Sequence, residues 1–465
     1  MSVIDRRHVL LSLLATAWAG TAAAQAPPPR KPAPRAGRLI GDARLNAQVH
    51  YAVFDRQGNL CEARGGDRPV APASTLKVLT TLYALDRLGP QARFATRVER
   101  VGNTLVLIGG GDPTLDTDGL ADLADLTAAA WTGTKPERFE VTGAQLPYIA
   151  EISAEQADHL AYNPSVSGMM LNFNRVHLSW RAGGSAMALE AQARRNNTPA
   201  YTIRAGAVGE GPLFSWREEG GREIWSVNRA GLRRAGSRWL PVRRPEAYAG
   251  DVFQTLCRAR GLVLPAPEVV GATAADTVPV ARIESAPLTD ILRDMMKYST
   301  NLTAEAIGLH ASGARDLPAS ARAMQAWAEA RGIEGLDLHD HSGMSPDNRV
   351  SARAMAQIIA RLGGPAGLRD LMKQVSIKNP DGAGGDLLLE EKTGTLNFVS
   401  NLAGYGHAAG QGEVIFAIFI ADMDRRAQTE GQELPAGVST WTQRAKQLQQ
   451  QLIRSWVSRY GADRG

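Results

Sequence analysis

A serine and a lysine three positions apart, Ser74 and Lys77, are the first residues whose spacing suggests catalysis. They begin an apolar stretch with helical spacing that stops at Gly89-Pro90, and residues i and i+3 share one face of a helix. A serine alcohol is a weak nucleophile that needs an adjacent base, and a lysine acts as that base only when burial or a nearby cation lowers its pKa. Taken alone, the spacing fits a helix cap and a surface lysine equally well.

A second pair, Ser299 and Asn301, follows an apolar helical segment at 291–296. If both side chains project into one cleft, Ser299 can relay a proton between Lys77 and a leaving amine, and Asn301 can bind a substrate carbonyl. The simpler interpretation of Asn301 is a helix N-cap for residues 302–309.

The third motif is Lys392-Thr393-Gly394-Thr395, between two apolar segments typical of strands. On an edge strand that faces a cleft, Lys392 offers positive charge and Thr393 a hydroxyl, which both suit a substrate carboxylate. Gly394 lets the backbone approach a ligand closely, and the N–H of Thr395 can join that of Ser74 in an oxyanion hole.

The order of the three motifs is more informative than any one of them. S-x-x-K, S-x-N and K-T-G, each in a suitable local setting, form the signature of penicillin-binding proteins and serine β-lactamases. The chain resembles in particular the low-molecular-mass class C penicillin-binding proteins, the D-Ala-D-Ala carboxypeptidase/endopeptidases of peptidase family S13. The resemblance covers most of the chain and includes segments 72–77, 109–115 (ending Gly-Asp-Pro-Thr-Leu), 162–176, 340–350 (Asp-His-Ser-Gly-Met-Ser-Pro-Asp-Asn-Arg-Val) and 392–405.

The resemblance implies an α+β fold. It consists of a serine β-lactamase/transpeptidase-like domain, an antiparallel sheet flanked by helices, that carries a large, mainly β, nested insertion. The expected ranges are 38–93 plus 285–465 for the catalytic domain, 94–176 plus 247–284 for the outer insert (domain II), and 177–246 for the inner insert (domain III).

The resemblance also implies the chemistry of the site, with peptidoglycan stem peptides and cross-bridges as substrates and β-lactams as inhibitors. No cofactor and no metal are expected. Two positions depart from the family pattern, Thr300 where Asp is usual and His341 where Gly is usual. The catalytic residues are then Ser74, Lys77 and Ser299, and the substrate-binding residues are Asn301, Lys392, Thr393, Gly394 and Thr395.

The elements that must position these residues follow from hydrophobic periodicity. Alternation at 48–55, a turn and a return strand at 60–64 predict a hairpin. Apolar strands at 399–405 and 414–420 lie near the other end of the chain, before a last helix at 441–456. With helices between them, these strands predict one antiparallel sheet closed by the two ends of the chain.

The first residues differ from the rest. Arg6-Arg7, a short apolar run at 9–19 and Ala22-Ala23-Ala24 form the pattern of a secretory signal at 1–24, by the general or the twin-arginine route. A Pro-rich linker is expected at 25–37. We therefore expect a periplasmic protein whose membrane contact is at most peripheral. The formal net charge of +5 fits an acidic envelope polymer without proving it.

Other chemistries are weaker. Cys61 and Cys257 are expected to be two separate buried thiols, because only geometry licenses a disulfide. His339 and His341 lack a third ligand for zinc, and are expected to be surface or loop residues. The interleaved arginines and tryptophans of 216–239 resemble the pattern of single-strand binders, but glutamates dilute them and export excludes nucleic acid; a solvated hairpin is expected.

Two rival functions share the signature. A serine β-lactamase would acylate in the same way, but no glutamate lies four residues before a Leu-Asn pair, as the deacylation loop of class A enzymes requires. A non-catalytic peptidoglycan-binding protein with a decayed site is disfavoured because all three motifs are intact. The sequence leaves open the balance of carboxypeptidase and endopeptidase activity, the preference at the third stem residue and the oligomeric state.

Overall fold

The computed structural model describes residues 34–274, 276–378 and 385–461. The expected signal peptide and most of the expected linker lie outside these ranges. The last two residues of the linker range already belong to helix α1 (Ala36–Ala43), so helical structure begins earlier than the prolines indicate. No helix among the described residues is both long enough and apolar enough to cross a membrane.

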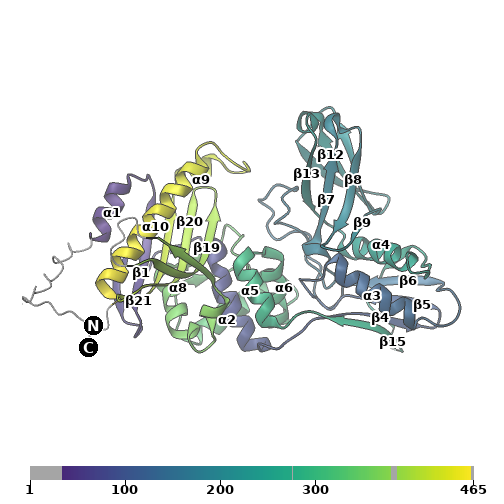
Figure 1. Ribbon diagram of the computed structural model, residues 1–465, viewed down its shortest axis with the longest axis horizontal. Helices are drawn as coiled ribbons and strands as arrows, with labels where there is room; N and C mark the ends of the chain where they lie inside the picture. The colour runs from purple at the N-terminus through teal and green to yellow at the C-terminus, as the bar shows by residue number, and fades with distance from the viewer. Residues whose placement is uncertain (1–33, 275, 379–384, 462–465) are drawn as a thin grey trace, which may run out of the picture.

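The main body is built on a six-stranded antiparallel sheet (Figure 1). Its centre joins the two ends of the chain, because the first strand pairs with the last, with Val49 opposite Ile420. The expectation of a sheet closed by both ends is therefore confirmed. In spatial order the strands are β18 (Lys373–Ile377), β19 (Leu387–Leu396), β20 (Val399–Ala408), β21 (Gly412–Ala421), β1 (Gln48–Asp55) and β2 (Leu60–Arg64).

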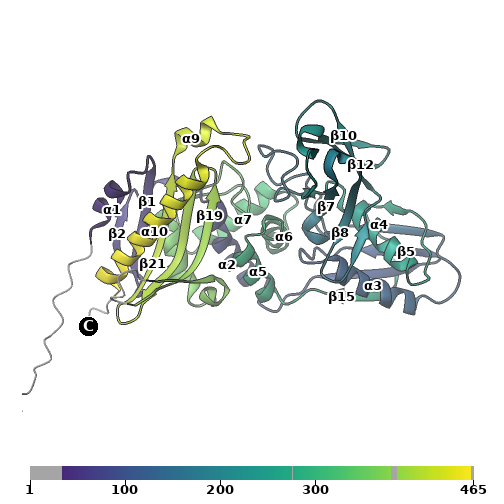
Figure 2. The same ribbon diagram turned by 45° about the horizontal axis from the view of Figure 1, so that its top comes forward.

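Helices cover both faces of this sheet (Figures 1 and 2). Side chains alternate between the faces of a strand, so Tyr51 and Val53 pack under α10 (Val438–Tyr460), whereas Ala52 and Phe54 join the core of the opposite helical layer. That layer contains α2 (Lys77–Leu88), α5 (Leu288–Tyr298), α6 (Asn301–Ser312), α7 (Leu317–Glu329), α8 (Ala352–Ile358) and the short helices η1 (Ala73–Leu76), η5 (Ile359–Gly363) and η6 (Leu368–Leu371). A small sheet of β3 (Pro69–Val70), β16 (Leu336–Asp337) and β17 (Arg349–Ser351), and helix α9 (Met423–Gln428), complete the body.

The chain leaves this body after α2 and returns before α5, and the neck is tied at that point. The N–H of Phe94 donates to the Ser285 hydroxyl at 3.0 Å, and the N–H of Ser285 donates to the Phe94 carbonyl at 2.9 Å. The ring of Phe94 stacks on His310 of α6 at 4.4 Å between centroids. The insertion is thus fixed to the helices on either side of the neck.

The outer part of the insertion is a mixed sheet with two helices. Its strands are β4 (Ala95–Val101), β5 (Thr104–Ile108), β6 (Arg138–Thr142), β14 (Pro267–Val269) and β15 (Val278–Glu284), and its helices are α3 (Thr117–Ala130) and α4 (Pro245–Arg258). The inner part rises from it as two small sheets (Figure 2). One holds β13 (Gly236–Pro241), β7 (Arg175–Trp180), β8 (Met187–Gln192) and β9 (Asn197–Pro199); the other holds β10 (Ile203–Val208), β12 (Arg222–Asn228) and β11 (Phe214–Glu219).

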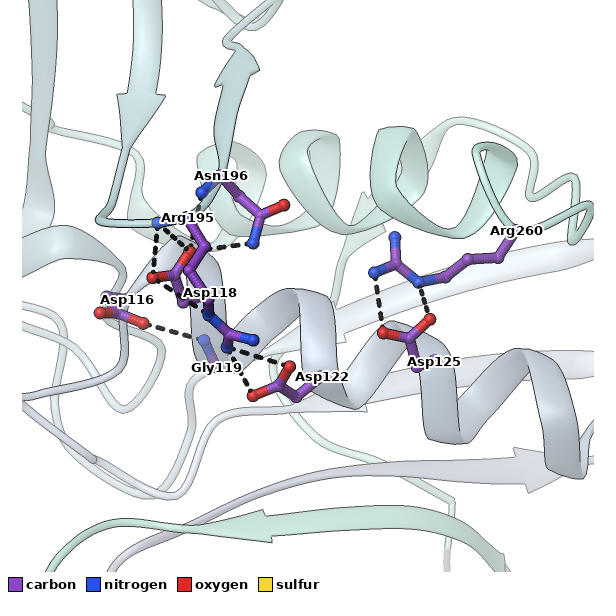
Figure 3. Close-up of polar contacts among 8 residues, drawn as sticks. All are labelled: Asp116, Asp118, Gly119, Asp122, Asp125, Arg195, Asn196 and Arg260. Carbon is purple, nitrogen blue, oxygen red and sulfur yellow. Dashed lines mark hydrogen bonds and ion pairs between the residues drawn. The ribbon is translucent and has the colours of Figure 1, made fainter.

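Carboxylates of α3 hold the inner part onto the outer part (Figure 3). Asp118 accepts the backbone N–H groups of Arg195 and Asn196 at 2.8–3.0 Å, and the Arg195 guanidinium pairs with Asp122 at 2.9 Å. A turn further along, Asp125 pairs with Arg260, which follows α4. One acidic helix therefore organises both a loop of the inner sheets and the end of the neighbouring helix.

One sequence expectation needs correction here. Trp225 is not part of a solvated hairpin, because its side chain is wholly buried in the core of the insertion, opposite Trp216 across β11 and β12. A run of alternating strand residues can bury one face even when the other is rich in arginine. The expectation of two buried thiols holds for Cys257, which is buried in α4, but not for Cys61, which is partly exposed.

Replacement of Trp456 tests how far the body depends on α10. Trp456 is fully buried and lies 5.0 Å from the ring of Tyr51. Trp456→Ala should lower the free energy of unfolding of the body by about 3–5 kcal/mol, the usual cost of such a cavity. Urea unfolding followed by circular dichroism measures it. Gln447→Ala, on the exposed face of the same helix, is the matched control and should change stability by less than about 0.5 kcal/mol.

Candidate active site

Ser74 and Lys77 meet where a short helix turns into α2. The ammonium nitrogen of Lys77 lies 2.9 Å from the hydroxyl oxygen of Ser74, as the i to i+3 spacing predicts. Ser74 is part-exposed at the floor of a cleft, whereas Lys77 is completely buried. Ala73, just before the serine, takes a left-handed backbone conformation with φ of 47°. Such backbone strain in a non-glycine residue is common beside functional groups.

The amine of Lys77 has three neutral hydrogen-bond acceptors from three elements. Besides Ser74, it donates to the side-chain oxygen of Asn301 and to the carbonyl of Ser342, each at 2.8 Å. Burial lowers the pKa of Lys77 to about 8, against the opposing influence of Glu305 and Asp340. A larger fraction of the amine is therefore neutral near pH 7.5 than at the ordinary pKa of lysine. The site therefore contains a lysine able to accept a proton near neutral pH.

Ser299 and Asn301 lie at the sharp turn between α5 and α6. Ser299 closes α5 in a left-handed conformation with φ of 59°, which directs its hydroxyl toward the cleft side of the turn. Asn301 is the first residue of α6, and Thr300 occupies the cap position. The interpretation of Asn301 as an N-cap is therefore wrong: its side chain instead joins Lys77 to the carbonyl of Tyr162 in the outer insert.

The K-T-G motif lies on β19, at a point where that strand becomes an edge. The pairing of β18 ends opposite Glu391, so the backbone from Lys392 onward has a neighbour on one side only. The buried ammonium of Lys392 donates to Ser299 at 2.8 Å and to the carbonyl of Thr393 at 2.9 Å. Burial, and then the charge of Lys77, hold the pKa of Lys392 well below its usual range.

The backbone of β19 packs directly against the nucleophile turn. A Cβ on Gly394 would lie 2.8 Å from the carbonyl oxygen of Pro72 and 3.0 Å from the nitrogen of Thr75, which explains the glycine. Asn401 of β20 reinforces the turn by donating to the carbonyls of Ala71 and Pro72 at 2.8 and 3.0 Å. Strand and turn thus form one rigid unit.

Two buried carboxyls that sequence reasoning did not assign shape the loop above Lys77. Glu305, one turn after Asn301 on α6, accepts the N–H groups of His341 and Ser342 at 3.0 and 2.8 Å. Asp340 accepts the N–H groups of residues 343–345 and the side-chain amide of Asn348. Burial and Asp340 raise the pKa of Glu305. The segment 340–350 of the family resemblance was the available signal for this loop.

His341 lies in that loop, but it is not a surface residue. Its ring is fully buried against Gly308 of α6, where any Cβ would overlap it, and one ring nitrogen lies 2.6 Å from the hydroxyl of Ser320. Burial lowers the pKa of His341 to about 3, so the ring stays neutral. His341 thus fills a space that the small residue of α6 leaves. Among the described residues, no group of three or more potential ligands could hold a metal.

All eight predicted site residues belong to one region of the molecule. The cleft above Ser74 has a volume of about 1070 Å³, and both the main body and the insertion line it. Ser299, Asn301 and Thr395 lie on the body side. Lys77 and Lys392 are buried behind this surface and linked to it by their hydrogen bonds.

The three motifs around one cleft of an α+β fold define the class of serine penicillin-binding proteins and β-lactamases. The solved structure of penicillin-binding protein 4 from Haemophilus influenzae has the same fold, with a TM-score of 0.68 at 18% identity over 90% of this chain and 99% of that one. Residues 42–443 match the model of the D-Ala-D-Ala carboxypeptidase 3 (S13) family. The chain belongs to that family, which makes it a serine-type D-Ala-D-Ala carboxypeptidase.

Two curated relatives are similar over most of their length. A carboxypeptidase of Mycobacterium tuberculosis is 28% identical, with 82% of each chain covered. A D-alanyl-D-alanine carboxypeptidase of Actinomadura sp. strain R39 is 27% identical, with 82% of this chain and 79% of that one covered.

A glycine substitution tests the packing of the loop against the nucleophile turn. Gly343 has a φ of 80°, and a Cβ there would overlap the carbonyl oxygen of Ala73. Gly343→Ala should slow acylation by a fluorescent penicillin at least tenfold, because it displaces the turn that carries Ser74. Gly313→Ala is the control, since its φ of 69° imposes the same backbone strain in open space at the end of α6. Equal acylation rates in the two variants would contradict this role of the loop.

Proposed function

We propose that the chain cleaves the terminal D-Ala-D-Ala bond of peptidoglycan stem peptides, and D-Ala-linked cross-bridges, through an acyl-enzyme on Ser74. The observation that carries the proposal is the buried, pKa-lowered amine of Lys77 at 2.9 Å from the Ser74 hydroxyl. The Actinomadura relative is a D-alanyl-D-alanine carboxypeptidase, which supports the same substrate. The Haemophilus structure in complex with a β-lactam supports inhibition by that class.

In the first step Lys77 accepts the proton of Ser74, whose oxygen attacks the carbonyl of the penultimate D-Ala. The backbone N–H groups of Ser74 and Thr395 stabilise the oxyanion of the tetrahedral intermediate. The close packing of Gly394 on the nucleophile turn supports this pairing of donors. The C–N bond then breaks, and the proton that Lys77 took from Ser74 passes through Ser299 to the leaving amine, while Lys392 donates a hydrogen bond to Ser299.

The substrate carboxylate would lie near Lys392 and Thr393, with Asn301 orienting the peptide. An incoming carboxylate favours the charged form of Lys392, so substrate binding offsets the burial that lowers its pKa. Water then hydrolyses the Ser74 ester, with the proton passing back through the same groups. A β-lactam forms the same ester, but its leaving group stays tethered and blocks this second step.

We infer a periplasmic location from the secretory pattern of residues 1–24 and the cell-wall substrate of the family. The mature protein would then act on the peptidoglycan layer from the aqueous side, without a cofactor.

Intact mass spectrometry after incubation with benzylpenicillin tests the nucleophile. Wild-type protein should gain the mass of one covalently bound benzylpenicillin, and this adduct should persist; Ser74→Ala should gain none. Lys392→Ala is a useful companion, because it should slow the adduct without moving it from Ser74. Rapid hydrolysis of the antibiotic without a lasting adduct would indicate a β-lactamase, and neither adduct nor hydrolysis would indicate a binding protein with an inert site.

The pH dependence of acylation tests Lys77 as the base. Only the neutral amine accepts a proton, so the second-order rate constant should rise about tenfold per pH unit from pH 6 and level off near pH 8, where the lowered pKa of Lys77 lies. Stopped-flow measurement with a fluorescent penicillin gives the profile, and circular dichroism at each pH checks the fold. A rate that is flat from pH 6 to 8 would remove Lys77 from this role.

A further inference from the structure

The cleft above Ser74 is bridged by an ion pair between its two walls. The strap, defined as residues 429–434 between α9 and α10, reaches from the main body toward the inner insert (Figures 1 and 2). Glu433 of the strap accepts a hydrogen bond from Arg238 of β13 at 2.8 Å, and its other oxygen lies 3.5 Å from His159. These partners are 195 and 274 residues away in sequence, so the contact joins separate parts of the fold.

The insert side of this bridge is a prearranged cluster. The buried ring of Phe214 contacts both insert residues of the bridge. The Arg238 guanidinium lies over this ring, 5.0 Å from its centroid, and the His159 ring stacks with it at 5.3 Å between centroids. Burial opposes ionisation of Glu433, but Arg238 and then His159 hold its pKa below the usual value. Burial and Arg238 lower the pKa of His159. At neutral pH the bridge is therefore a carboxylate facing one guanidinium and a neutral imidazole.

The body side of the bridge is attached to the K-T-G strand. Asn397, just beyond the end of β19, donates to the carbonyl of Gln432 in the strap at 2.7 Å. Glu433, His159 and Asn397 line the same cleft as Ser74 and Thr395. The strap is thus joined to the end of β19 on one side and to the insert on the other.

We propose that Arg238 and Glu433 determine which substrates reach Ser74, by admitting free peptide ends under the bridge and delaying cross-linked peptides until it opens. This inference rests on the proposed function. In a carboxypeptidase substrate, one side of the scissile bond is a single D-Ala. In a cross-link, peptide continues on both sides of the scissile bond and is attached to glycan at each end. A cross-linked peptide therefore has no free end to pass beneath the closed bridge, and it enters the cleft only when the bridge opens.

The bridge is weak enough to open. Glu433 is 46% exposed and Arg238 is 24% exposed at the side chain, and exposed ion pairs add little to stability and are screened by salt. The ion pair itself therefore adds little to the free-energy cost of opening the bridge. The bridge therefore slows cleavage of cross-linked peptides relative to free peptide ends by a modest factor and does not block it.

The experiment compares two substrates in each variant: a muropeptide monomer ending in D-Ala-D-Ala and a cross-linked muropeptide dimer. Arg238→Ala and Glu433→Gln should each raise kcat/KM for the dimer about two- to fivefold, the range open to an exposed ion pair, with the monomer value unchanged. The ratio of kcat/KM for the dimer to kcat/KM for the monomer summarises the selectivity. The reversed pair, Arg238→Glu with Glu433→Arg, should return this ratio part of the way to the wild-type value. In wild type, about 0.5 M NaCl should shift the ratio toward that of the variants.

Arg217→Ala is the matched control, because it removes an exposed pair with Glu219 on the same insert and should leave the ratio unchanged. A ratio that stays constant in Arg238→Ala and Glu433→Gln, or that changes equally in the control, would overturn the bridge as a selector. The benzylpenicillin adduct is measured on every protein. If the wild-type protein formed no adduct and released no D-Ala, the proposed function itself would be overturned.

Discussion

The active site depends on one buried amine, which lies where several elements of the fold meet. Lys77 is fully buried, and its hydrogen-bond partners are a hydroxyl, a side-chain amide and a backbone carbonyl. Such an environment disfavours the charged form, and the two carboxyls nearby, Glu305 and Asp340, limit that effect. The three acceptors come from η1, α6 and the loop after β16, so the amine is correctly placed only when these elements meet.

The insertion is attached to the same elements. It leaves the body after the helix that begins with Lys77 and returns before the helix that ends at Ser299. The paired hydrogen bonds of Phe94 and Ser285 close the neck, and Asn301 reaches the carbonyl of Tyr162 in the insertion. The insertion, which forms the far wall of the cleft, is therefore joined by hydrogen bonds to the elements that carry the residues at the floor of the cleft.

The sequence was sufficient for the sheet that joins both chain ends and for the residues of the three motifs, because hydrophobic alternation and short spacings are local signals. The sequence did not predict the structural role of Glu305 and Asp340, because locally each is only a carboxyl in an apolar setting. Glu305 accepts a backbone N–H group 36 residues away, and Asp340 accepts N–H groups across a loop. Asn301 was ambiguous for the same reason, since a helix start offers both a cap and a long-range contact. The burial of Trp225 and of the loop residue His341 was missed, because burial depends on packing partners that are distant in sequence.

The pairing of β1 with β21 also sets the order in which the protein can become active. Asn401 supports the nucleophile turn from a position 330 residues later in the chain, and β1 has only β2 as a neighbour until β21 exists. Contacts of such long sequence separation form late and slowly in folding. A chain that is still being synthesised has Ser74 and Lys77 before it has the strands that fix them. The nucleophile turn is therefore held in place only after the last strands of the chain have joined the sheet.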